Sequence, residues 1–108
     1  MEIRVDPLAH PVRRDVLRLL GDSRWPLSTA ELAQRLGCSR RTILYHLGIL
    51  NEEGALSELK ETDAEGSFTR RWASSVKDDE DVNAMLAKTL AGDRRALERR
   101  LDAKRTAA

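Results

Sequence analysis

Apolar residues near the start of the chain recur at steps of three and four, which is the spacing of an amphipathic helix. This stripe predicts a first helix that begins near Pro7 and is closed by Gly21, because glycine readily adopts the left-handed conformation that ends helices. Pro11 falls in the first turn, where its missing N–H costs least. The members of the stripe are Leu8, Val12, Val16, Leu19 and Leu20.

Polar residues then mark the starts of two further helices. Ser28 and Glu31 have the spacing of a capping box, which predicts a short helix that starts at this serine and stops at Gly37. Ser39 is a second candidate N-cap, and a helix over residues 40–53 is expected after it. Two helices joined by a short turn with glycine are typical of a helix-turn-helix motif.

The remaining pattern predicts a β-hairpin and a final helix. Residues 55–61 and 67–74 read as two short strands around an acidic turn at 63–66. Helical periodicity resumes at Asp78, where acidic residues suit the start of a helix. Gly92-Asp93 interrupts this pattern, because glycine weakens a helix interior and aspartate can cap a new one, so we expect a kinked helix or two helices.

This order of elements defines the expected fold class: mainly α with a small β-hairpin wing, a winged helix-turn-helix with a C-terminal dimerisation helix. The chain has 108 residues, about the size of one modest domain. We expect residues 1–76 to form the winged helix-turn-helix domain for DNA binding. Residues 77–108 are expected to form a helical extension for dimerisation.

Composition adds little about function. The net charge of +1 does not by itself indicate a nucleic-acid partner. The lone Cys38 cannot form an internal disulfide. Neither a signal peptide nor an apolar run of about 18 residues is present, so the sequence predicts no membrane span and a cytoplasmic location.

The second helix of the motif has an outward face suited to DNA. At about 100° per residue, Ile43, Leu47 and Leu50 fall on one side and Arg41 and Tyr45 on the other. Arginine can donate to two acceptors on guanine, and recognition helices enter the major groove by their N-terminal end. With hydroxyls at the helix starts and cations of the wing, the expected DNA-contacting residues are Ser28, Thr29, Ser39, Arg40, Arg41, Thr42, Tyr45, His46, Lys60, Arg70 and Arg71.

These segments resemble the ArsR-like winged-helix transcription regulators of bacteria and archaea. The resemblance covers roughly residues 6–75 and rests on DPLAHPVRRDVLRLLG and on LSTAELAQRLGCSRRTILYHLGILNEEGAL. It implies a homodimer that binds an inverted-repeat operator in double-stranded DNA, usually as a repressor. Packing of the last stripe on its own domain is the alternative. The interface expected between first and last helices comprises Leu8, Val12, Val82, Met85, Leu86, Leu90, Leu97 and Leu101.

The chain departs from that family at positions where family members bind metals or DNA. Family members that sense metals carry paired cysteines or clusters of histidine and carboxylate, whereas this chain has Cys38 and two histidines on different elements. No metal and no cofactor is therefore expected. Leu44 and Gly48 stand where the family often has a polar residue and a cation. A glycine inside a helix costs about 1 kcal/mol, so Gly48 is either tolerated or permits close approach of DNA or a partner helix.

Other functions are weighed against DNA binding. A winged-helix module for protein contact, with little or no DNA binding, is favoured by the near-neutral charge and the acidic wing turn. Arg70 shares a strand face with Phe68 and Trp72, so it can stack on an aromatic ring instead of contacting phosphate. No pattern typical of a catalytic site is present, and an enzyme is not expected. The operator, the direction of regulation, the inducing signal and a redox role of Cys38 stay open.

Overall fold

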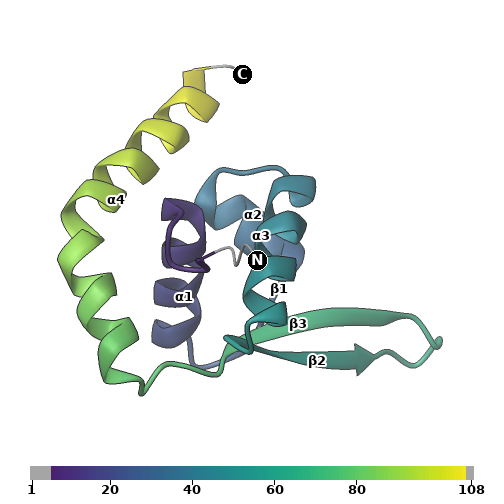
Figure 1. The fold of residues 1–108 in the computed structure, drawn as a ribbon. Helices are drawn as coiled ribbons and strands as arrows, with labels where there is room; N and C mark the ends of the chain where they lie inside the picture. The colour runs from purple at the N-terminus through teal and green to yellow at the C-terminus, as the bar shows by residue number, and fades with distance from the viewer. Residues whose placement is uncertain (1–5, 107–108) are drawn as a thin grey trace, which may run out of the picture.

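The computed structural model describes residues 6–106, and these residues adopt the expected order of elements with one added strand (Figure 1). Three short helices and a three-stranded antiparallel sheet form the winged helix-turn-helix, which confirms the predicted fold class. A long C-terminal helix runs alongside the first one. The elements are α1 Pro11–Asp22, β1 Leu27–Ser28, α2 Thr29–Leu36, α3 Arg40–Glu52, β2 Leu56–Thr62, β3 Phe68–Ser74 and α4 Glu80–Thr106.

The sheet has the strand order β1-β3-β2. Strands β2 and β3 form the predicted hairpin, with Leu56 opposite Ser74 at its base. Strand β1 is the addition, and its Leu27 lies opposite Trp72. Strand β1 was not predicted, because two residues are too few to show the alternation of a strand.

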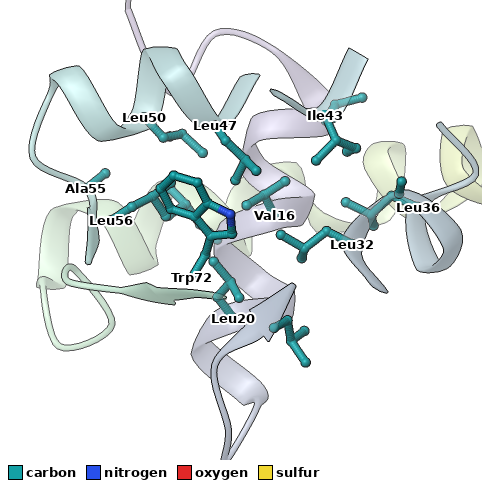
Figure 2. Packing of buried hydrophobic residues seen from close by; sticks show 14 residues of the cluster. Val16, Leu20, Leu32, Leu36, Ile43, Leu47, Leu50, Ala55, Leu56 and Trp72 are labelled. Atoms are coloured by element: carbon teal, nitrogen blue, oxygen red, sulfur yellow. The ribbon is translucent and has the colours of Figure 1, made fainter. Parts of the chain in front are cut away.

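A tryptophan stands at the centre of the core (Figure 2). Trp72 of β3 is 2% exposed, and its indole N–H donates to the Thr29 hydroxyl at 3.1 Å. Apolar residues of α1, α2 and α3 surround the indole ring and bury most of its area, so the wing is fixed to the helices. The other large side chains in this fully buried group are Val16, Leu32, Ile43, Leu47 and Leu50.

Helix α2 begins and ends as its sequence predicts. The Ser28 hydroxyl accepts from the Glu31 amide at 3.2 Å, and the Ser28 amide donates to Glu31 Oε1 at 3.1 Å. Gly37 ends the helix with a φ of 65°. A β-carbon at this glycine would lie 3.1 Å from Leu101 Cδ2. Both the backbone angle and the close approach of α4 therefore favour glycine here.

Helix α1 differs from its prediction at both ends. It begins later than expected, after His10, whose Nδ1 accepts from the Val12 amide at 3.1 Å. Gly21 does not close the helix, which continues to Asp22 and is capped at Ser23. The predicted stop was wrong because this glycine adopts no left-handed angle, and so it gives the chain no reason to leave the helix.

Helix α4 is one uninterrupted helix, so of the two expected alternatives the division into two helices at Gly92-Asp93 is wrong. Asp93 does not cap a new helix, because its carboxylate is held by α1. It accepts from Arg14 Nε at 2.7 Å, from Arg14 Nη2 at 2.9 Å and from Arg18 Nη1 at 2.8 Å. The bonds from Arg14, followed by those from Arg18, lower the pKa of Asp93 from its usual 3.8 to about 2.

A second buried carboxylate extends these contacts. Asp15 of α1 accepts from Arg18 Nη1 at 2.9 Å and from Arg100 Nη2 at 3.2 Å. Burial nevertheless outweighs these bonds and raises the pKa of Asp15. Arg100 Nε also donates to the Leu36 carbonyl at 3.2 Å. The network thus ties α4 both to α1 and to the end of α2.

Candidate nucleic-acid interface

Helix α3 presents polar and cationic side chains opposite its core face. Ser39 caps the helix by accepting from the Thr42 amide at 3.1 Å, and its own hydroxyl donates to Thr42 Oγ1 at 2.9 Å. Arg40 and Arg41 are exposed and form no ion pair with any residue in the range 6–106. Tyr45 is 65% exposed. These predicted DNA-contacting residues are therefore available on the outer side of the N-terminal half of α3.

His46 lies on the inner side of α3, which corrects its assignment as a DNA contact. It is 5% exposed, and its Nδ1 accepts from Arg13 Nη1 at 3.1 Å. Its ring packs on His10 with centroids 4.4 Å apart, so the two histidines meet although they lie on different elements. Tyr45 packs edge-on against His46 at 5.2 Å between centroids. His46 is close to Ile43 around the helix, and it supports Tyr45 from behind.

We expect His46 to make the protein sensitive to acid. Burial, with smaller effects from His10 and Arg13, lowers the pKa of His46 from 6.5 to about 4. Between pH 4 and 6.5 the unfolded chain binds a proton at this histidine that the folded chain does not. The contribution of neutral His46 to the free energy of unfolding is therefore fully present above pH 6.5 and falls as the pH drops toward 4. The loss should be on the order of 2–3 kcal/mol.

Urea unfolding of wild type and His46→Asn across this pH range measures the effect. Asparagine can still accept from Arg13 but does not titrate, so the variant should lose most of the pH dependence. His10→Asn is the comparison, because asparagine is a good N-cap and His10 is the exposed member of the pair. Burial also lowers the pKa of His10, so this variant should lose a smaller part of the pH dependence than His46→Asn. An equal slope in wild type and His46→Asn would contradict the assignment.

The hydroxyls at the start of α2 are engaged within the chain. Ser28 is half-buried in the capping box with Glu31. Thr29 is 7% exposed and accepts from Trp72. Thr29 is thus a core residue, and its assignment as a DNA contact was wrong, because the turn that begins α2 points its side chain inward. The amide of Ser28, together with a bond from the Ser28 hydroxyl and one from Arg71, lowers the pKa of Glu31.

Two of the three predicted cations of the wing, Arg70 and Arg71, are paired with wing carboxylates. Arg70 Nε donates to Glu58 Oε1 at 2.7 Å, and its guanidinium lies 4.9 Å from the Trp72 ring centroid. Stacking on an aromatic ring, the alternative expected for Arg70, is therefore present. Arg71 Nε donates to Glu61 Oε2 at 2.7 Å. Because these side chains are 26–67% exposed, the pairs are weak and can exchange for other anions.

An open cleft of about 450 Å³ lies between the start of α2, the first turns of α3 and the wing. Its lining includes Ala30, Phe68 and Thr69, which no sequence pattern assigned to a site. Phe68 is 59% exposed, and Lys60 Nζ lies 5.5 Å from its ring centroid. The four-residue spacing of Phe68 and Trp72 along β3 placed both on one strand face, but only the tertiary fold brings this face to α3.

The residues predicted for a dimer interface fall into distinct environments. Val12 is 4% exposed and belongs to the chain's own core, which corrects its assignment, because this side of α1 faces α2 and α3. Met85 and Leu90 are 38% and 37% exposed. Leu101 lies against the turn at Gly37. Four others are half-buried and pack against the same core, as expected if the apolar stripe of the last helix covers its own domain: Leu8, Val82, Leu86 and Leu97.

The remaining candidate chemistry is sparse in the described part of the chain. Cys38 is half-buried, and its thiol donates to the Leu36 carbonyl at 3.5 Å. Residues 6–106 contain no group of three or more His, Cys, Asp or Glu side chains placed to hold a metal ion. None of the helices within this range has the length and apolar character needed to cross a membrane.

Comparisons with known proteins agree with this architecture. Residues 8–58 match the family model of a helix-turn-helix domain. The chain is also similar to the solved structure of an ArsR-like transcriptional regulator from Rhodococcus sp. RHA1. The two are 27% identical with a TM-score of 0.55, and the match covers 93% of this chain and 82% of that one. A search of curated proteins finds no match. The chain therefore has a winged helix-turn-helix fold, and in sequence and structure it is similar to an ArsR-like transcriptional regulator.

Proposed function

We propose that the protein is a homodimeric, sequence-specific regulator that binds an inverted repeat in double-stranded DNA and represses transcription by occupying it. The observation that carries this proposal is the outer side of α3. Its arginines make no ion pair among residues 6–106, and they stand beside Thr42 and Tyr45 at the end of the helix that can enter a major groove.

The groups on α3 divide by the part of DNA that each can reach. Arg41 lies opposite the core stripe and is the candidate for a bidentate bond to guanine. Tyr45 adjoins it one turn later, where its hydroxyl can bond a base edge or a phosphate. Arg40 lines the cleft toward the wing, so we assign it to the phosphate backbone. Arg41 and Tyr45 would then carry the sequence preference.

The homodimer is proposed to form through α1 and α4. Leu90 lines both open grooves that border α4, of about 300 and 240 Å³, and it is exposed together with Met85. Exposed apolar residues beside such grooves suit a second copy of the chain, since a two-fold interface buries the same patch twice. A dimer would hold two α3 helices at the spacing of two half-sites, about one turn of DNA apart.

Selection from a random library of duplex DNA tests this function. The purified protein is expected to enrich an inverted repeat and to bind it as a dimer, measured by mass in solution. Its affinity should fall steeply between two salt concentrations, because contacts to phosphate release counterions. A library that stays unenriched, with only weak binding, would contradict the proposal.

The paired cations of the wing favour a second candidate, a module for protein contact. Because Arg70 and Arg71 are already bonded to Glu58 and Glu61, the wing offers a mixed-charge surface instead of a basic one. This candidate predicts feeble DNA binding without sequence preference. The same selection experiment therefore distinguishes the two functions.

Replacing Gly48 with alanine should separate folding from DNA binding. A β-carbon at Gly48 would meet no atom within 4 Å, so the variant should be more stable by about 0.5–1 kcal/mol through helix propensity alone. If α3 approaches DNA closely at this point, operator affinity should fall while stability rises. Thermal unfolding and operator titration measure the two effects.

Gly37→Ala is the control for this substitution. It should destabilise the protein, because Gly37 has a φ of 65° and Leu101 lies against it. A loss of stability in Gly48→Ala would show that the helix needs glycine at that position for a reason internal to the fold.

A further inference from the structure

Leu44 is an exposed leucine on the DNA-facing side of α3. Its side chain is 43% exposed, whereas Ile43 and Leu47, its apolar neighbours on the core face, are at most 1% exposed. Folding therefore does not account for a large apolar side chain at this position. At about 100° per residue, Leu44 lies about 60° from Arg41 around the helix axis. It faces the same groove that Arg41 is proposed to enter.

The surroundings of Leu44 combine apolar and cationic groups. Leu44 and Phe68 give the cleft between α3 and the wing its large apolar side chains, and Arg40 and Thr69 line the same cleft. Arg40 offers an unpaired charge for phosphate among the described residues. Such a surface complements a major groove, where phosphates flank the base edges and the C5 methyl of thymine is the apolar group to contact.

Gly48 follows Leu44 by one turn on the same side of the helix. It is exposed, and no atom in the described chain lies within 4 Å of where its β-carbon would be. The missing side chain lets the helix backbone come close to the base pairs. A leucine one turn earlier is long enough to reach a methyl group in the groove at that approach.

We infer that Leu44 is a specificity-determining residue that contacts the C5 methyl group of a thymine in each operator half-site. The inference rests on the proposed function, since it names the base chemistry that the same surface recognises. Leu44 adds apolar readout to the polar readout of Arg41 and Tyr45. Its contact is separate from that of Arg40, which is assigned to the phosphate backbone of the DNA.

Replacement of thymine by uracil in the selected operator tests the inference, because it removes the methyl group and leaves the pairing edge unchanged. Each thymine is replaced in turn, at symmetric positions of both half-sites. At the thymine that Leu44 contacts, the affinity of wild type should fall about three- to fourfold for each methyl group removed. Leu44→Ala should bind thymine and uracil equally there. Leu59→Ala, which removes a leucine that is 48% exposed on β2, should keep the full difference.

The outcomes separate the inference from the function on which it rests. Two results would overturn the assignment of Leu44 and leave the proposed regulator intact. In the first, wild type binds the selected operator equally well with uracil at every thymine position. In the second, Leu44→Ala keeps the difference in affinity between thymine and uracil that wild type shows. Failure to select any operator overturns both. Cytosine and 5-methylcytosine at the same position form a further arm. A gain with 5-methylcytosine that depends on Leu44 shows that the methyl group itself is recognised.

Discussion

Replacing Asp93 with alanine is expected to lower the free energy of unfolding by about 3 kcal/mol, because the change leaves Arg14 without a carboxylate and leaves Arg18 with Asp15 alone. Arg14 and Arg18 point three hydrogen bonds at Asp93, and their side chains are only 13% and 14% exposed. They cannot turn fully to water while α4 covers them. For a domain of this size the melting temperature should fall by about 10 °C or more, measured by circular dichroism.

Asp102→Ala is the matched control on the same helix. Asp102 is 73% exposed, and its ion pair with Arg105 spans 3.7 Å within α4, so its removal should cost less than about 0.5 kcal/mol. Losses of similar size in the two variants would refute the role of Asp93 as the bond between α1 and α4.

Acid should reproduce the effect of Asp93→Ala. The folded pKa of Asp93 is about 2 and its usual value 3.8, so the stabilisation is complete above pH 3.8 and is lost as the pH falls toward 2. This window lies below that of His46. Acid unfolding should therefore weaken the contact of α3 with α1 before that of α4 with α1.

The local signals in the sequence were sufficient for the helix-turn-helix. Ser28 with Glu31, Gly37 and Ser39 each determine a helix end through bonds among neighbours, and all lie where the pattern placed them. Apolar spacing likewise identified the buried side of α3. These features depend on residues three or four apart, which a sequence displays directly.

Features that depend on distant segments were missed. Asp93 was interpreted from its neighbour Gly92 alone, although it lies seven residues after Leu86 and four before Leu97, on the inward stripe of α4. A charge at a stripe position, matched by two arginines four residues apart on the first helix, was the available signal for a buried ion pair. The contact of His10 with His46 had no such signal, because it depends on where the start of α1 lies against α3.

The DNA-contacting residues were predicted as a set that spans α2, α3 and the wing, and the structure divides that set. Thr29 of α2 and His46 of α3 are buried and leave it, and exposed Leu44 joins it as a candidate. Helical angles place residues on a face but do not say how far a neighbouring element covers that face. Here the start of α1 covers the edge of α3 that holds His46, and the wing leaves a cleft at the other edge.

Replacing Arg41 with alanine is expected to remove most of the sequence preference of DNA binding while the protein stays folded. A bidentate bond to guanine contributes about 1–3 kcal/mol for each half-site. A dimer that loses two such bonds should bind its operator at least about 30-fold more weakly, and its binding of unrelated duplexes should change little. Tyr45→Ala should act in the same direction, because its ring is exposed beside Arg41 and only its edge packs on His46.

Arg40→Ala is the matched control for Arg41→Ala. Arg40 and Arg41 are adjacent, exposed and equal in charge, so loss of charge alone would affect both alike. If Arg40 contacts phosphate, its removal should weaken binding to all sequences equally and reduce the salt slope by about one unit per contact. Titrations of operator and scrambled duplex at several salt concentrations distinguish the two arginines. Unchanged preference in both Arg41→Ala and Tyr45→Ala would mean that α3 reads DNA through another face or does not read it at all.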